Sequence, residues 1–210
     1  AMHDPKTLKD LLEGFRARGD QPAIMVDRED RFETWTYRWL VGQATRLAQG
    51  LIAAGVAPGE PIAILAPNSA AWIAAYFGVV AAGATAVPLD HRAPSGELEE
   101  MLARGECRRL FTIAAALERL PQPWRNGDHV IYLMEEAKQP ASGVVSWDTL
   151  TETQPAIVLP VVQPDTRASL LFTSGTTGTP KAVPLCHQHF VANVTALLSE
   201  HIIANGDRVL

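Results

Sequence analysis

The order of apolar and polar positions divides the chain into short extended runs and longer helical stretches. The pair Asp4 and Pro5 predicts the cap and the first residue of an opening helix. Two short apolar runs on either side of a charged turn, 27–31, predict a hairpin, and Thr36 is expected to cap the long amphipathic helix that follows. Gly55 stands where a left-handed helix end is expected.

The central part of the chain alternates strand-like and helix-like patterns. The strand-like runs are 62–65, 84–89, 109–113 and 130–133. Asn68 or Ser69 is expected to cap the first helix between them, and Ser95 the second. Strands that alternate with helices predict a parallel sheet with right-handed crossovers. The predicted fold class is therefore α/β, with a doubly wound parallel sheet and helices on both of its faces, in a subdomain that covers 1–140.

The pattern changes after Met134. Prolines interrupt the periodicity, which predicts an irregular connection over 141–166 with a short edge strand at 157–159. A strand, a polar loop, a second strand and a helix from His187 onward come next. These elements predict the start of a second, β-rich α/β subdomain over 167–210, which is incomplete where the sequence ends.

Composition and charge narrow the range of functions. Of the 210 residues, 47% are hydrophobic and 20% are charged, as in an ordinary globular chain. The net charge of −5 makes the chain a poor candidate for binding nucleic acid through its phosphates. The eighteen residues 70–87 carry no charge, but their alanines and glycines favour a buried helix and strand over a membrane span. The start of the sequence shows no signal-peptide pattern, and Cys107 and Cys186 are expected to be reduced thiols, which favours a cytoplasmic location.

The polar loop at 173–181 is the segment with the clearest chemistry. It contains five hydroxyl side chains, two glycines and one lysine between two apolar strands. Glycines allow backbone N–H groups to turn inward, and inward N–H groups with hydroxyls and an ammonium group bind a polyphosphate well. The loop is not a Walker A motif, because Pro180 stands five residues after Gly175 and a strand follows Lys181. The competing interpretation is a polar turn that binds nothing.

A second pattern of interest is the run His187-Gln188-His189. Two histidines are candidate metal ligands, but residues two apart on a helix face different directions, and the sequence offers no third ligand nearby. The alternative role of His187 is capping or packing at the start of the last helix.

The nine-residue string TSGTTGTPK at 173–181 resembles the phosphate-loop signature of the AMP-forming adenylate synthetases. This superfamily contains acyl-CoA synthetases, the adenylation domains of nonribosomal synthetases, and luciferases. Further landmarks of the family follow in the same order as in its members, and they are Thr36-Tyr37, Gly55-Val56, Pro58-Gly59-Glu60, Pro67-Asn68-Ser69, Ala82-Gly83-Ala84 and Val87-Pro88-Leu89. The resemblance covers nearly all of the chain.

The resemblance implies an enzyme that uses ATP and Mg²⁺ to convert a carboxylic acid into an acyl-adenylate and pyrophosphate. Most members then pass the acyl group to a thiol, often that of coenzyme A. The residues that would hold the β- and γ-phosphates are Thr173, Ser174, Gly175, Thr176, Thr177, Gly178 and Lys181. Of these, Thr176 is the candidate for proximity to magnesium, and Lys181 would act as an electrostatic clamp. No catalytic residue is expected within these 210 residues.

Members of the superfamily run to several hundred residues. The resemblance therefore implies that this chain is an N-terminal fragment, inactive by itself and prone to self-association through exposed apolar surface. The full-length parent is expected to be an acyl-CoA synthetase that acts on a fatty acid. An acyl-AMP ligase, an aryl-acid adenylating enzyme and a carrier protein as acceptor remain open. The alternative from another class is a short non-catalytic module that retains a phosphate-binding loop.

Overall fold

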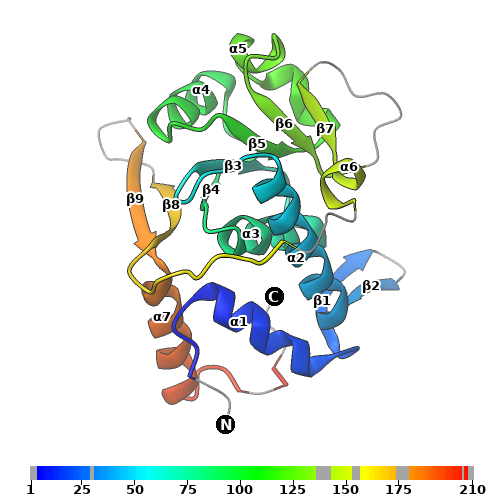
Figure 1. The fold of residues 1–210 in the computed structure, drawn as a ribbon, viewed down its shortest axis with the longest axis vertical. Helices are drawn as coiled ribbons and strands as arrows, with labels where there is room; N and C mark the ends of the chain where they lie inside the picture. The colour runs from blue at the N-terminus through cyan, green and yellow to red at the C-terminus, as the bar shows by residue number, and fades with distance from the viewer. Residues whose placement is uncertain are drawn as a thin grey trace.

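A seven-stranded sheet forms the centre of the molecule, and a separate two-stranded sheet lies beside it (Figure 1). The computed structural model describes residues 4–28, 31–135, 143–152, 157–173, 180–204 and 206–207. The strands of the large sheet are β3 (Pro61–Leu65), β4 (Thr85–Pro88), β5 (Arg109–Thr112), β6 (Val130–Leu133), β7 (Val144–Ser146), β8 (Arg167–Thr173) and β9 (Lys181–Cys186). The small sheet consists of β1 (Pro22–Arg28) and β2 (Arg31–Thr36).

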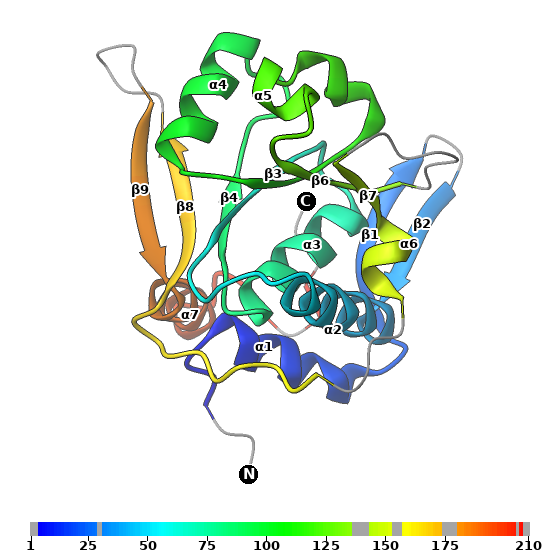
Figure 2. The same cartoon turned by 45° about the horizontal axis from the view of Figure 1, so that its top comes forward.

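Helices cover the large sheet on both faces (Figure 2). They are α1 (Leu8–Gly14), α2 (Tyr37–Ala53), α3 (Ala70–Ala81), α4 (Ser95–Arg104), α5 (Gln122–Arg125), α6 (Trp147–Thr151) and α7 (His187–Ser199). Two 3-10 helices, η1 (Phe15–Arg18) and η2 (Ala114–Arg119), complete the description. The sequence predicted neither η2 nor α5, which are short turns between β5 and β6.

The core is split by the sheet into two apolar clusters. In β3, Ile62 and Ile64 belong to the cluster that contains α1, α2 and α3, whereas Ala63 and Leu65 belong to the cluster that contains α4 and α5. Successive side chains of a strand point to opposite faces, so a continuous apolar strand has to be covered on both sides. The central strands are therefore buried on both faces, which agrees with the helices predicted on both faces of the sheet.

The strand order is β7-β6-β5-β3-β4-β8-β9, and all neighbours except β8 and β9 run parallel. The prediction of an α/β fold with a doubly wound, mostly parallel sheet is confirmed. β8 pairs with β4 through Ala86 and Ser169, so the segment 167–186 continues the same sheet. The division into subdomains over 1–140 and 167–210, with a connection between them, stays a prediction.

Two of the expected helix caps are wrong. Thr7, and not Asp4, caps α1, because its Oγ1 accepts a hydrogen bond from the Asp10 N–H while the Asp10 carboxylate accepts one from the Thr7 N–H. This reciprocal pair satisfies two N–H groups at once. Ser95 is the first residue of α4 and follows Pro94, which provides no side-chain cap. The caps expected at Thr36 and at Ser69 are confirmed.

The connection expected to be irregular contains more structure than the sequence indicated. β7 pairs with β6, and Ser146 then caps the short helix α6. The edge strand expected at 157–159 is wrong, since that segment is extended without a strand partner. Side chains bind it instead: Gln49 donates to the carbonyl of Ile157 at 3.1 Å, and Lys9 donates to the carbonyl of Pro160 at 2.9 Å.

The uncharged stretch 70–87 forms α3, a turn and β4. Gly83 adopts a φ of +78° after the helix, which allows the chain to reverse into the sheet. None of the helices within the described ranges is both long enough and apolar enough to span a membrane.

Candidate functional site

The candidate site lies at the carboxyl ends of the parallel strands β3, β4 and β8. The connection from β3 through α3 leads to β4 on one side, and the connection from β4 through α4 leads to β5 on the other side of β3. The two helices therefore lie on opposite faces of the sheet. In open α/β sheets, a crevice that binds ligands forms where neighbouring connections leave in opposite directions.

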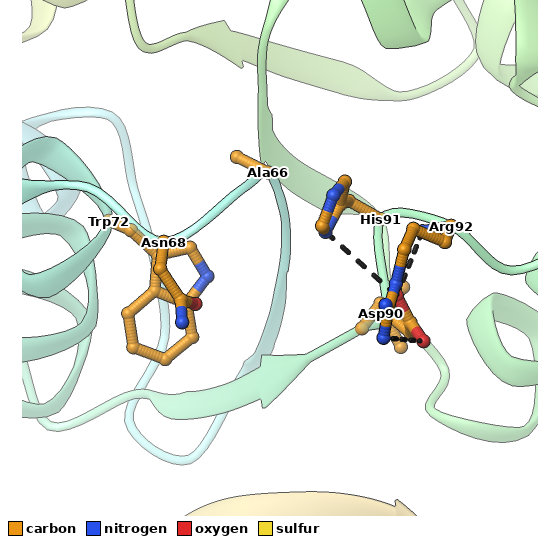
Figure 3. Close-up of a pocket in the computed structure, with 7 residues that line it drawn as sticks. Ala66, Asn68, Trp72, Asp90, His91 and Arg92 are labelled. Atoms are coloured by element: carbon orange, nitrogen blue, oxygen red, sulfur yellow. Dashed lines mark hydrogen bonds and ion pairs between the residues drawn. The ribbon is translucent and has the colours of Figure 1, made fainter. Parts of the chain in front are cut away.

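A cavity of about 450 Å³ occupies this position. Its lining residues are Ala66, Asn68, Trp72, Leu89, Asp90, His91 and Arg92. Figure 3 shows Asn68 and Trp72 on one side of it, with Asp90, His91 and Arg92 on the other. We call this cavity the β3–β4 crevice.

One wall of the β3–β4 crevice is a charged turn directly after β4. The Asp90 carboxylate accepts hydrogen bonds from the Arg92 backbone N–H at 2.9 Å and from its Nε at 3.2 Å. These bonds lower the pKa of Asp90 and raise that of Arg92. The His91 Nδ1 lies 3.9 Å from the same carboxylate. Arg92 is thus a held cation at the mouth of the crevice.

The opposite wall is aromatic. The Trp72 ring stacks on Tyr76 with the ring centroids 5.6 Å apart and the planes at 12°. Tyr76 in turn contacts the edge of Phe190 from α7, at 6.5 Å between centroids. Burial raises the pKa of Tyr76, and its hydrogen bond with Ser169 opposes that shift. These contacts support Trp72 from behind, so the crevice has a rigid aromatic surface.

The predicted phosphate loop joins β8 to β9. These strands form an antiparallel hairpin in which Thr173 and Lys181 are direct partners, and both residues are exposed. The loop residues Ser174, Gly175, Thr176, Thr177 and Gly178 lie outside the described residues. The two predicted strands on either side of these residues are confirmed, whereas the phosphate-binding roles stay predictions. Because β8 runs parallel to β4, its carboxyl end at Thr173 points to the same edge of the sheet as the strand ends that line the β3–β4 crevice.

The histidines at the start of α7 bind different segments. His187 is fully buried, and its Nδ1 accepts a hydrogen bond from the Leu8 N–H at 3.2 Å, which joins α7 to α1. His189 Nδ1 accepts a bond from the Cys186 N–H at 3.0 Å. No three metal-ligating side chains gather anywhere in the part of the chain that the structure describes. The packing role expected for His187 matches its position.

We expect protonation of His187 to destabilise the fold in mild acid. Burial lowers its pKa to about 4, from 6.5, and the nearby Asp10 carboxylate opposes this shift only in part. The unfolded chain therefore binds the proton first, so stability is full above pH 6.5 and falls as the pH drops toward 4. From this group we expect a loss of about 1 kcal/mol between about pH 7 and about pH 5.5, measured by urea unfolding.

The variant His187→Asn is the control for this titration. Its amide oxygen retains an acceptor for the Leu8 N–H, but the side chain does not titrate. The difference in stability between the two pH values should shrink in the variant. An undiminished difference would show that other groups cause the acid sensitivity.

Sequence reasoning missed the crevice residues Trp72, Asp90, His91 and Arg92. Their signal was positional, because the predicted strands 62–65 and 84–89 end beside the two segments that line the crevice. The order of strands in the sheet was needed to know that these two ends are neighbours with connections on opposite faces.

Comparison with known proteins identifies curated relatives of this chain that include two acid ligases. A sulfoacetate–CoA ligase from Cupriavidus necator is 29% identical over 191 residues, which cover 91% of this chain and 36% of the relative. The fatty acid–acyl-carrier-protein ligase ScoC from Streptomyces coeruleorubidus is 32% identical over 207 residues, covering 95% of this chain and 37% of the relative. The chain thus spans little more than a third of the length of these relatives.

Solved structures show the same fold. The anthranilate CoA ligase AuaEII, in complex with anthranoyl-AMP, superimposes with a TM-score of 0.75 at 27% sequence identity, over 91% of this chain and 36% of that one. The family model described as AMP-binding enzyme matches residues 13–210. This chain belongs to the family of AMP-binding, adenylate-forming enzymes.

Proposed function

We propose that this chain supplies the ATP-phosphate site of a ligase that activates a carboxylic acid as acyl-AMP and then transfers the acyl group to coenzyme A. The observation that carries the proposal is the β8–β9 hairpin. It presents Thr173 and Lys181 as partners at the two ends of a loop rich in hydroxyls and glycines. Membership of the AMP-binding family supports the same reaction class.

In the first step, the carboxylate oxygen bonds to the α-phosphorus of ATP, and the bond from that phosphorus to the bridging oxygen breaks. Pyrophosphate leaves with the electron pair, so negative charge grows on the departing group. An ammonium group and backbone N–H groups fixed around this group stabilise that charge. We assign the hold on the β- and γ-phosphates to Thr173, Ser174, Gly175, Thr176, Thr177, Gly178 and Lys181.

Magnesium suits the same loop, because hydroxyl oxygens are the hard ligands that Mg²⁺ prefers. We propose that the Thr176 hydroxyl lies near this ion. When bound, the ion neutralises part of the charge on the phosphate oxygens. Lys181 supplies the protein's own share of that neutralisation.

In the second step, the thiol sulfur bonds to the acyl carbon, AMP leaves with the electron pair, and the thiol proton passes to solvent. We propose that the β3–β4 crevice binds part of the acceptor. It combines the aromatic surface of Trp72 and the amide of Asn68 with the cation Arg92. Aromatic and cationic groups together suit a planar ring that carries anionic groups, as in coenzyme A.

We propose a fatty acid as the substrate. The relative ScoC is named for a fatty acid, and it is 32% identical to this chain. The sulfoacetate and anthranilate ligases, both named for coenzyme A, support that acceptor over a carrier protein.

The test is acid-dependent exchange of pyrophosphate into ATP, in a full-length ligase that carries this chain. We expect exchange with fatty acids above the level without acid, followed by a coenzyme A thioester. Exchange with aryl acids only would replace the substrate assignment, and exchange without thioester would replace the acceptor. No exchange with any acid would favour a non-catalytic module. The 210-residue chain by itself is expected to show no exchange, since its relatives are more than twice as long.

A further inference from the structure

We infer that Arg119 is a positioning residue, which holds the charged wall of the β3–β4 crevice in the geometry that binds the acceptor substrate. This inference rests on the proposed function of the crevice.

Arg119 reaches the crevice wall from a separate element. It ends η2, and its half-buried guanidinium donates from Nη1 to the His91 carbonyl at 2.6 Å and from Nη2 to the Ala93 carbonyl. These two carbonyls flank Arg92, so the two bonds bracket the residue that presents its charge to the crevice. The guanidinium is a planar fork with a fixed spacing of donors, and it therefore fixes both carbonyls at once.

The bracketed segment is a turn between regular elements, with Ala93 packed in the core cluster on one side of the sheet. It follows β4, which ends at Pro88, and precedes α4, which begins at Ser95, so neither carbonyl lies within a strand or a helix. The turn is closed by the bond from the Ala93 N–H to the Asp90 carbonyl at 3.0 Å. The Arg92 side chain is 79% exposed. Its guanidinium is paired with Asp90 of the same turn, so the position of both side chains depends on the backbone that carries them.

Arg119 does not itself line the crevice. Its effect on a ligand is therefore transmitted through the turn, and specifically through the backbone on either side of Arg92. If the turn is ordered before the ligand binds, less conformational entropy is lost on binding, and the affinity is higher. Loss of the fork should weaken binding in the crevice and leave the β8–β9 hairpin, which Arg119 does not contact, unchanged.

The decisive variant is Arg119→Lys in the full-length ligase, because lysine keeps the charge and loses the fork. We expect the KM for coenzyme A to rise about tenfold, while the KM for ATP and kcat stay within about twofold. Arg119→Gln, which retains an amide donor, should also raise the KM for coenzyme A. Arg125→Lys is the matched control, since the exposed Arg125 side chain donates to Gln122 within α5 and to no other described side chain.

A double variant tests whether the effect passes through Arg92. Arg92→Lys should raise the KM for coenzyme A by itself, and adding Arg119→Lys should then raise it by much less than tenfold. Full additivity of the two changes would overturn the inference. An unchanged KM for coenzyme A in both Arg119 variants would overturn the inference as well. An equal change in the KM for coenzyme A, the KM for ATP and kcat would also overturn it, because such a change indicates a general structural role for Arg119.

Failure of the proposed function is a separate result. It would appear as absence of pyrophosphate exchange or of thioester in the unmodified ligase. If Arg119→Lys does not fold, the test uses Arg119→Gln in the 210-residue chain. Hydrogen exchange at the backbone amides of Arg92 and Ala93 should then be faster in the Arg119→Gln variant than in the unmodified chain. Unchanged exchange at both amides would overturn the inference.

Discussion

Replacement of Lys181 by alanine, in a full-length ligase that carries this chain, is expected to lower kcat/KM for ATP by about 10- to 150-fold. This corresponds to about 1.5–3 kcal/mol, the contribution of a hydrogen bond to a charged group. Lys181 is exposed at the first position of β9, directly opposite Thr173, and it makes no ion pair with any described residue. Its ammonium group is therefore available to a phosphate. Steady-state kinetics with ATP varied at saturating acid provide the measurement.

Lys6→Ala is the control for this change of charge. Lys6 precedes α1. Its backbone N–H donates to the Asp10 carboxylate, which alanine retains, and its ammonium group makes no ion pair with a described residue, so its loss should leave the kinetics with ATP unchanged. Equal kinetics for Lys181→Ala and the unmodified ligase would remove Lys181 from the nucleotide site. Equal losses in both variants would point to a long-range effect of net charge.

Gly50→Ala is expected to lower the free energy of unfolding of the chain by about 2–3 kcal/mol. Gly50 lies in α2 where α6 crosses it, and a Cβ at this position would stand 1.9 Å from the Leu150 carbonyl oxygen. The obstacle is backbone, so α6 must move away from α2. The gain from replacing a helical glycine, about 1 kcal/mol, offsets only part of this cost. Urea unfolding followed by circular dichroism measures the change.

Gly42→Ala in the same helix is the matched control. There the nearest atom to a new Cβ is Arg46 Nη1 at 3.6 Å, the end of a flexible side chain. We expect this variant to be more stable by about 0.5–1 kcal/mol, because alanine loses less entropy than glycine in a helix. If both variants changed stability in the same direction and by the same amount, the close approach of α6 would not be the cause.

The elements that periodicity predicted well are those whose pattern and caps agree. α2 has a spaced apolar face and the cap Thr36, and the central strands are continuous apolar runs. The elements that were missed are short, and contacts far away in the sequence stabilise them. β7 has three residues that pair with β6, and α6 has five residues and packs on α2 through Leu150. Such segments carry too few positions to show a period.

The candidate site also has one part that the local sequence predicts and one part that depends on the fold. The hydroxyls, glycines and lysine of the loop are local in sequence, so their chemistry could be predicted without the fold. The walls of the β3–β4 crevice come from two segments, at Asn68 and at Arg92, that become neighbours only through the sheet. The Arg119 bonds add a third segment, and nothing in the pattern around Arg119 distinguishes it from other surface arginines.

By itself, the sequence determined the α/β class, the two strands on either side of the predicted phosphate loop, and the residue types within that loop. These depend on spacing and side-chain chemistry within about ten residues, which the order of amino acids contains directly. The tertiary structure alone decided which strand ends are adjacent, where the crevice opens, and which arginine holds its wall. Strand order is set by the packing of the whole core, so the contacts that follow from it join residues too far apart for any local pattern to record.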